Sequence, residues 1–466
     1  LQTIQALPGI ISIDERVSNL NVRGGTHDQN LILWDGIKMY QSGHFFGLIS
    51  AFNPYLTEHV VVSKNGTSAR YGDGVSSIID MQSSNRISNK FSGGIGTNLV
   101  YSNAYAKIPI SKKLELQLSA RRSITDFLST PTYDEYFERI FQDSDLTNQN
   151  SNTSSINERF YFYDASVKAI YNISEKDQVN FNFLNIYNNL NYDETSTTNN
   201  ITEATKSNLT QRNFGYALNY NRIWNDKLNT SVQLYLSHYD LFSTNNDIIN
   251  NQVLKQINEV NDNGLKIHVN YAINENIKYL GGYELMEISI SNFEDINNPI
   301  FRRYVKEVLT TNAFFNEVAF KSNSGKTNAR IGIRANYIDK FSNFYMEPRV
   351  SFSQKFLDHF RFEVLAEIKS QTTSQIIDLQ NDFLGIEKRR WILANDNDVP
   401  LMQSEQISLG VHYNKNKLLL SIEGFMKNVY GITARNQGFQ NQFQFINDTG
   451  AYRVRGIDFL INKQFK

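Results

Sequence analysis

The 466-residue sequence predicts an all-β membrane protein, in which a small α+β domain precedes a transmembrane antiparallel β-barrel. Three observations predict this class. Polar and apolar residues alternate in roughly sixteen segments after residue 91, the connections between these segments differ in length in a regular way, and aromatic residues make up 13% of the chain.

Each expected strand has one apolar and one polar face. In residues 114–119 (LELQLS) leucine occupies every second position, and residues 360–369 and 407–411 follow the same pattern. Many segments have about the 9–11 residues that a tilted strand needs to cross a bilayer. A soluble repeat or a stack of β-sandwiches is the alternative, but sandwich strands average about five or six residues. Residues 158–172 and 227–242 are longer than that.

The connections alternate between tight turns and longer polar stretches. Short turns are expected near residues 110–113, 173–178, 224–227, 274–276, 323–326, 356–359 and 414–416. Longer stretches rich in Asn, Ser and Thr are expected at 125–157, 192–208, 242–255, 292–305, 373–403 and 431–450, and the link near 341–345 is an exception because it is short. Tight turns at one end and long loops at the other are typical of an outer-membrane barrel.

Aromatic residues gather toward the ends of the expected strands. Examples are residues 160–163, Tyr235 with Tyr239, and residues 341–345. Amphipathic rings prefer the headgroup level of a membrane, so we interpret these groups as interfacial girdles. Any single ring could instead be an ordinary core aromatic.

The composition excludes several function classes. The chain has no Cys, which excludes disulfide scaffolds, thiolate zinc sites and thiol nucleophiles within it. The 46 basic and 47 acidic residues give a net charge of −1, so we expect no nucleic-acid partner. No run of 18 apolar residues is present, and no leader is visible at the start, so we expect no membrane-spanning helix.

The first ninety residues hold more glycine and fewer long alternations than the rest, which indicates a separate domain. Its motifs follow in order: Leu7-Pro8-Gly9, Val22-Arg23-Gly24-Gly25, Asp28-Gln29-Asn30, Asp35-Gly36, Phe52-Asn53-Pro54, and residues 60–72 (VVVSKNGTSARYG). Each piece alone is weak. In this order and spacing they resemble the plug domain of TonB-dependent outer-membrane transporters, especially those of the Bacteroidota, and the resemblance covers the whole chain as plug plus barrel.

The resemblance implies a plug domain at residues 1–90 and a barrel at residues 91–466. A barrel that contains such a domain belongs to the class with about 22 strands, of which about 16 are expected here. We therefore interpret the sequence as an internal fragment, with the start of the plug, the signal peptide and the TonB box upstream and further strands downstream.

The resemblance also implies a function in the outer membrane of a Gram-negative bacterium. External loops and the plug apex would capture a scarce ligand, a siderophore-iron chelate or an oligosaccharide, and the inner-membrane TonB complex would pull on a segment upstream of this chain. Outer-membrane lipid and a SusD-like surface lipoprotein are the other expected partners. No enzymatic activity and no cofactor are expected. The alternative is a surface-binding or structural barrel that does not transport.

Individual plug residues have a local physical role as well. Gly24, Gly25, Gly36, Gly66 and Gly72 would supply turns or close backbone approach. By resemblance, we expect Arg23, Lys64 and Arg70 to contact the barrel wall or the loops of the plug, with the two guanidinium groups pairing with carboxylates. Ordinary surface charges are the alternative. Asp35, Asn53, Pro54 and Tyr71 complete the plug motif.

The most apolar part of the plug is residues 40–52 (YQSGHFFGLISAF). Core packing is one interpretation. In the other, Tyr40, His44, Phe45 and Phe46 belong to an apical loop that faces the ligand vestibule, with the histidine as a polar handle and the rings as a stacking surface.

No catalytic motif is present: the sequence lacks HExxH, GxSxG and Walker patterns. Asp143 with Asp145, and Asp396 with Asp398, could bind calcium but fit solvated loop carboxylates better, and we expect no metal site. Residues 133–142 predict a short amphipathic helix over the barrel mouth, or a rim for a partner lipoprotein. Aromatic loops would suit sugars, and residues 388–390 (KRR) would suit an anionic chelate.

Overall fold

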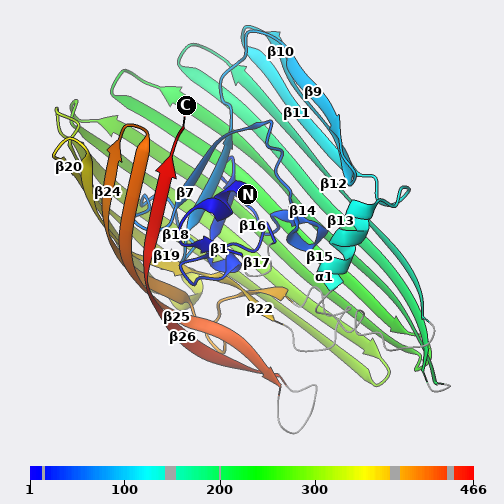
Figure 1. The fold of residues 1–466 in the computed structure, drawn as a ribbon. Coiled ribbons are helices and arrows are strands. Elements are labelled where there is room, and N and C mark those ends of the chain that lie inside the picture. Colours follow the sequence, from blue (N-terminus) through cyan, green and yellow to red (C-terminus); the bar gives the residue numbers. More distant parts are fainter. Residues whose placement is uncertain (13–15, 142–153, 199–200, 378–388, 438–444, 466) are drawn as a thin grey trace.

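In the computed structural model, a large curved sheet wraps around the N-terminal part of the chain (Figure 1). The structure describes residues 1–12, 16–141, 154–198, 201–377, 389–437 and 445–465. The sheet has 16 strands, and each is antiparallel to its neighbours. We call this sheet the wall. In the described part of the chain, no helix is long and apolar enough to cross a membrane.

The strands of the wall follow one another in chain order, interrupted once by an inserted hairpin, from β9 at one edge to β26 at the other. They are β9 (Ser92–Thr97), β10 (Tyr101–Ser111), β11 (Leu114–Ser123), β12 (Ser154–Asn172), β13 (Asp177–Thr198), β14 (Ile201–Ile223), β15 (Leu228–Asp247), β16 (Gln252–Ala272), β17 (Ile277–Asn297), β18 (Ile300–Lys321), β19 (Thr327–Ile338), β20 (Asn343–Phe356), β21 (Phe360–Gln371), β24 (Met402–Lys415), β25 (Leu418–Gln437) and β26 (Phe445–Lys463).

The apolar face of the wall points outward, which separates a membrane barrel from a soluble sandwich. In β24 the alternating Ile407 and Leu409 are 43% and 51% exposed, whereas the polar Ser404 and Ser408 on the other face are buried. A soluble sheet would bury its apolar face instead. The sheet therefore has the lipid-facing outside and polar inside of an outer-membrane barrel.

The predicted tight turns are confirmed, but two of the predicted long loops are wrong. All predicted tight turns lie at one end of the wall. At the other end, residues 242–255 and 292–305 were expected as loops, yet most of them continue the strands, with Asp247 opposite Gln252 and Asn297 opposite Ile300. Their Asn and Thr side chains suggested loops, but the antiparallel ladder satisfies the backbone whatever the side chains are.

Several of the aromatic residues that were predicted to form an interfacial girdle do not face outward. Phe160, Phe162, Tyr235 and Tyr239 are buried on the inner face, so they are not girdle residues. Tyr171, Trp224 and Tyr271 are exposed and lie next to the tight turns. Period-two patterns define two faces but do not say which ring faces lipid.

Residues 1–83, which contain the predicted plug motifs, form a small unit inside the curve of the wall, and we call them the plug segment (Figure 1). Its main sheet has the order β4-β3-β8-β7, with β3 and β8 parallel. Its elements are η1 (Gln2–Ala6), β1 (Ile10–Ile11), β2 (Asn21–Val22), η2 (His27–Gln29), β3 (Leu31–Trp34), β4 (Ile37–Lys38), β5 (Gly43–His44), η3 (Phe45–Gly47), β6 (Ile49–Ser50), β7 (Thr57–Ser63) and β8 (Ile78–Ser83).

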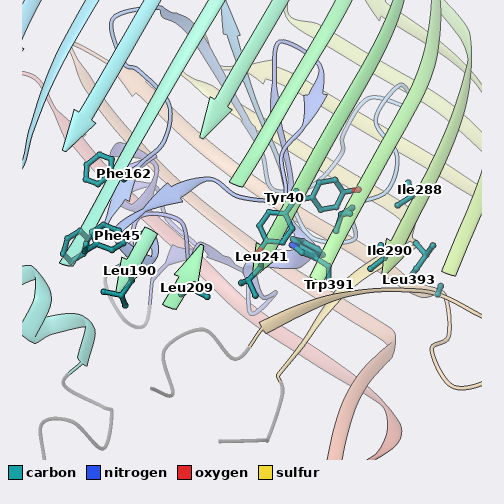
Figure 2. Packing of buried hydrophobic residues seen from close by; sticks show 14 of the residues in the cluster. Tyr40, Phe45, Phe162, Leu190, Leu209, Leu241, Ile288, Ile290, Trp391 and Leu393 are labelled. Atoms are coloured by element: carbon teal, nitrogen blue, oxygen red, sulfur yellow. The ribbon is translucent and has the colours of Figure 1, made fainter. Parts of the chain in front are cut away.

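Two hydrophobic clusters dock the plug segment on the wall. In one, Ile37 and Ile79 pack in a cluster with Leu184 and Ile186 of β13. The other, which we call the apex cluster, joins Tyr40 and Phe45 to the inner face near the long-loop end (Figure 2). Helix α1 (Pro131–Phe141) contributes to this second cluster and lies where the sequence predicted a helix over residues 133–142, of which residue 142 lies outside the described residues.

Candidate functional site

The first contact between the plug segment and the wall is a charge cluster at β25 and β26. Arg23 donates hydrogen bonds to Asp458 at 2.8 and 3.1 Å and lies 2.6 Å from Glu423, while Lys64 Nζ is 2.7 Å from Asp458. Gly24 follows with φ of +75°, and a Cβ there would lie 2.6 Å from Val454. The glycine thus allows the turn to approach β26 closely.

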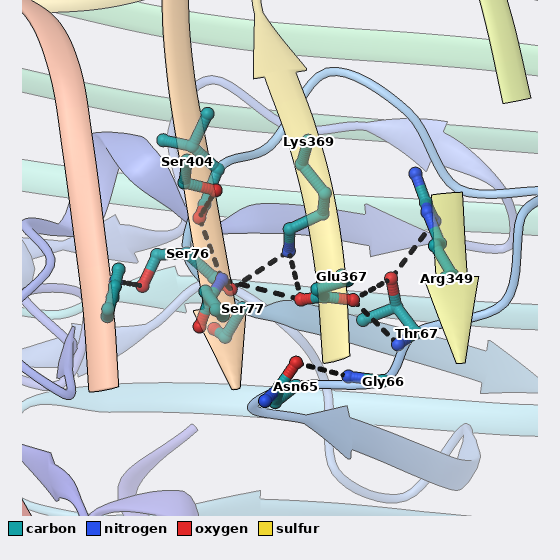
Figure 3. A network of polar contacts seen from close by, with 12 residues as sticks. Asn65, Gly66, Thr67, Ser76, Ser77, Arg349, Glu367, Lys369 and Ser404 are labelled. Carbon is teal, nitrogen blue, oxygen red and sulfur yellow. Dashed lines mark hydrogen bonds and ion pairs between the residues drawn. The ribbon is translucent and has the colours of Figure 1, made fainter. Parts of the chain in front are cut away.

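The second contact is centred on Glu367 of β21 (Figure 3). One of its oxygens accepts hydrogen bonds from Thr67 N and Oγ1, both at 2.7 Å, and the other lies 3.1 Å from Lys369 Nζ. Lys369 also donates to Ser76 O at 2.9 Å, and Arg349 donates to Thr67 Oγ1 at 3.0 Å. Two stretches of the plug segment therefore share one buried charge network on the wall.

The predicted Arg70-Tyr71-Gly72 motif contacts the wall through its backbone. Arg334, which is paired with Glu284 at 2.7 Å, donates to Arg70 O at 3.3 Å. A Cβ on Gly72 would lie 2.6 Å from the Arg334 guanidinium. The Arg70 guanidinium donates to the Tyr71 hydroxyl, not to the carboxylate that we expected, because Tyr71 stands between it and Asp80.

The other motif residues divide between wall contacts and local turns. Asp35 accepts hydrogen bonds from Ser83 and lies 3.4 Å from Lys168, and Gly36 O accepts from Lys266 at 2.8 Å. The Gly66 carbonyl accepts a hydrogen bond from Arg330 of β19, and Gly25 packs against Ser76 and Lys427. Asn53 forms a local turn instead: its side chain accepts a hydrogen bond from Tyr55 N, beside the exposed Pro54.

The apex residues 40–46 are mostly enclosed. His44 is fully buried, with Nε2 3.0 Å from Asp164, Nδ1 2.8 Å from Asn188, and its ring stacked on Phe162. Burial lowers the pKa of His44 below its usual value, against the contact with Asp164, and the charge of Arg121 adds to the lowering. In this conformation the His44 ring is enclosed by side chains of the wall.

The aromatic neighbours of the apex are likewise covered. Phe45 is fully buried and packs edge-on against Phe160 and against Tyr133 of α1. Tyr40 donates to Asp262 at 2.8 Å, while Phe46 stays partly exposed. The expected stacking surface is therefore closed by α1 and the wall, apart from Phe46.

A hairpin that was not predicted from the sequence covers the apex residues 40–46 on the side of the long loops. Strands β22 (Thr373–Ile377) and β23 (Arg389–Leu393) fold inward, and Trp391 meets Tyr40 edge-on at 5.0 Å (Figure 2). Thr372 donates to Asp73 at 2.6 and 2.8 Å, and Lys38 bonds both Asp73 and Thr373. Burial would raise the pKa of Asp73, but Lys38 and Thr372 lower it.

Two of the predicted loop charges, Arg389 and Arg390, are hydrogen-bonded within the protein. Arg390 is buried and donates to Gln256 at 3.1 Å, and Arg389 donates to Asn19 at 2.7 Å. Lys388, Asp143 and Asp145 lie outside the described residues. Within the residues that the structure covers, no group of three or more His, Asp or Glu side chains could hold a metal ion.

Sequence reasoning missed the carboxylates of the wall that hold the plug segment. Glu367, Glu423 and Asp458 carry these contacts, yet none has a motif. What the three share in the sequence is an acidic residue on the inward face of an alternating strand. A barrel without a plug would need only polar groups there, because water would satisfy them, so a buried acidic residue at such a position indicates a partner inside the barrel.

Comparison with known proteins agrees with this architecture. Residues 2–77 match the family model of the TonB-dependent receptor plug domain. The fold is similar to the siderophore receptor PirA of Pseudomonas aeruginosa, with a TM-score of 0.63, 13% identity, and coverage of 98% of this chain and 77% of that one. A search of curated protein sequences found no match.

Two further solved structures have the same fold. The ferric enterobactin receptor PfeA of Pseudomonas aeruginosa gives a TM-score of 0.67 at 12% identity, covering 99% of this chain and 74% of that one. The copper transporter OprC gives a TM-score of 0.67 at 12% identity, with 99% and 73% covered. Residues 2–77 therefore match the TonB-dependent receptor plug domain, and the chain as a whole has the fold of these solved outer-membrane receptors.

Proposed function

We propose that the protein takes up a scarce ligand across the outer membrane in a TonB-dependent, energised step. The observation that carries this proposal is the way in which the plug segment is held. It lies inside the wall on ion pairs and hydrogen bonds such as those of Arg23 and Thr67, which water can replace when the plug is pulled. Together with the two hydrophobic clusters, these polar contacts distinguish the plug segment from a domain that is held by apolar packing alone.

The cargo in this proposal is a siderophore-iron chelate or an oligosaccharide, with the chelate preferred. The names of the similar structures, which include siderophore receptors and a copper transporter, support metal-bearing cargo. The apex residues Tyr40, His44, Phe45 and Phe46 would then form the floor beneath α1 and the β22–β23 hairpin, and a ligand would reach them only when those elements move.

The partners follow from the same proposal. TonB would act on a segment that precedes the plug, as in other TonB-dependent receptors, and outer-membrane lipid would surround the outward face of the wall. We further propose the Bacteroidota type and a SusD-like lipoprotein over the loops. Residues 1–90 would move as the plug domain while residues 91–466 stay in the membrane as the barrel.

The test compares uptake by cells that carry the full-length protein with and without a functional TonB. The probes are radiolabelled ferric siderophores and labelled oligosaccharides, and surface binding is measured in parallel. Uptake of one probe only in the TonB-positive strain, with equal surface binding in both, is expected. Binding without uptake in either strain would favour the alternative, a surface-binding barrel that does not transport.

A further inference from the structure

A polar cavity separates the plug segment from one side of the wall. Its volume is about 220 Å³, and its lining comes from β3 and β8 on one side and from β12 to β17 on the other. Asn180 and Asn221, which line it, lie next to the tight turns 173–176 and 224–227. In outer-membrane barrels the tight turns face the periplasm, so the cavity lies on the exit side of the plug segment.

Within the described residues, four buried polar atoms around this cavity have no hydrogen-bond partner: Asp80 Oδ1, Asn180 Oδ1, Asn182 Oδ1 and Arg70 Nε. Asp80, Asn180 and Asn182 are 4%, 1% and 1% exposed. A buried polar atom that lacks a partner destabilises the folded protein. Four such atoms on one cavity would be satisfied by a molecule with hydrogen-bonding groups, either water or a ligand.

In two of these groups, Asn180 and Asp80, the other polar atom already has hydrogen-bond partners, so the free oxygen is the atom left for the cavity. The Asn180 amide nitrogen donates to Asn85 and Gln178, each at 3.3 Å, and leaves its oxygen free. Asp80 Oδ2 accepts from Tyr71 at 2.8 Å and from Gln82 at 2.7 Å. The open groups are thus three acceptors and one donor.

The charges that line the cavity are largely compensated. Lys168 lies 3.4 Å from Asp35, Glu284 is paired with Arg334 at 2.7 Å, and Lys266 donates to Gly36 O. Three open acceptors disfavour an anion. A metal ion would need a group of acidic or histidine ligands, and the described residues contain no such group.

We infer that this cavity is an exit-side binding site for an uncharged, hydroxyl-bearing molecule of about the size of one sugar ring. A hydroxyl both donates and accepts, so one ring with several hydroxyls matches the three acceptors and the Arg70 donor together. The volume is that of about seven waters at about 30 Å³ each, which fits a single ring. As a binding site for cargo, it rests on the proposed uptake function and would serve the second cargo class named there, the oligosaccharide.

The test is saturation-transfer NMR with D-glucose as the probe, on the purified full-length protein in a detergent without sugar headgroups. A saturable glucose signal is expected, and gluconate, its anionic counterpart, should give none. The double variant Asn180→Leu/Asn182→Leu keeps the side-chain shapes but removes two acceptors, so the apparent affinity should fall roughly tenfold or more. The control Asn189→Leu lies on the same strand, and its amide is bonded to Thr210 at 3.0 Å outside the cavity lining.

A second variant keeps the inference testable if the double variant folds poorly. Ser231→Tyr would fill the cavity from β15 and should abolish the glucose signal. Absence of a signal in the wild type, meaning that only water occupies the site, would overturn the inference, and so would a signal that survives in both variants. This assay needs no TonB, so a negative result would contradict the binding site without contradicting the proposed uptake. Conversely, TonB-independent uptake would contradict the proposed function without contradicting the binding site.

Discussion

Arg23 of the plug segment donates two hydrogen bonds to Asp458 of β26, a residue 435 positions later in the chain. Both side chains are almost fully buried, and Lys64 adds a second cation to the same carboxylate at 2.7 Å. The contact joins two turns of the plug segment to one point on the wall. Any movement of the plug segment away from β26 must therefore break this cluster.

The substitution Asp458→Asn should loosen that attachment. Removing one partner of a buried ion pair typically costs about 3–5 kcal/mol, and Glu423 remains as a second acceptor for Arg23, so we expect a loss of about 2–3 kcal/mol. Hydrogen exchange of peptides that cover residues 20–25 and 60–66 measures this free energy of opening. The control is Asp295→Asn, which removes an exposed pair with Arg302 and should change nothing measurable. Equal effects of the two variants would contradict the assignment.

The Glu367 network predicts a second weak point of the same kind. In Glu367→Gln the side chain keeps its shape but loses the charge that balances Lys369, which is buried, and the amide would face the Thr67 donors. We expect a destabilisation of about 3 kcal/mol of the stretch 65–77. Faster trypsin cleavage after Arg70 in the folded protein reports it. The matched control on β21 is Glu363→Gln, whose carboxylate is partly exposed beside His412; cleavage as fast in that variant would count against the network.

The sequence predicted the architecture well because the relevant signals are local. Alternation in residues 407–411 defines a strand with an apolar face, and Arg23-Gly24 defines a turn. Which residue on the wall meets Arg23 is not a local property, since it depends on how the whole sheet curves around the plug segment. No pattern near Asp458 identifies it as the partner.

The inward hairpin could not be predicted for a similar reason. Residues 373–403 are polar and long enough for an external loop, and their composition says nothing about direction. The direction is set by contacts such as Thr372 with Asp73 and Trp391 with Tyr40, which exist only after the plug segment is in place. The burial of His44 and Phe45 depends on the same enclosure.

Trp391→Ala should open the apex. The ring is buried against Tyr40, and truncation of a core tryptophan costs about 3–5 kcal/mol. Because the 466 residues contain no cysteine, a single Ser42→Cys reporter on the buried apex can be labelled with maleimide. Labelling should become at least about tenfold faster in the Trp391 variant. Trp224→Ala, at an exposed ring near the tight turns, is the control and should leave the rate unchanged.

The buried His44 predicts a pH dependence of the plug segment. Its ring is enclosed by Asp164, Arg121, Asn188 and Phe162, and burial lowers its pKa in the folded protein. The unfolded chain, with a histidine pKa of about 6.5, therefore binds a proton that the folded state does not. Stability should fall as pH drops below about 6.5, by at most about 1.4 kcal/mol per pH unit, until the folded pKa is reached.

Thermal unfolding between pH 7.5 and pH 5 measures this slope. His44→Gln cannot titrate in that range but keeps hydrogen-bonding capacity toward Asp164, so its melting temperature should vary less with pH than that of the wild type. His59→Gln is the matched control, since His59 is 70% exposed on β7 and should leave the wild-type slope intact. If the His44 variant kept the full slope, other groups would carry the pH dependence, and the enclosed ring would be a packing element alone.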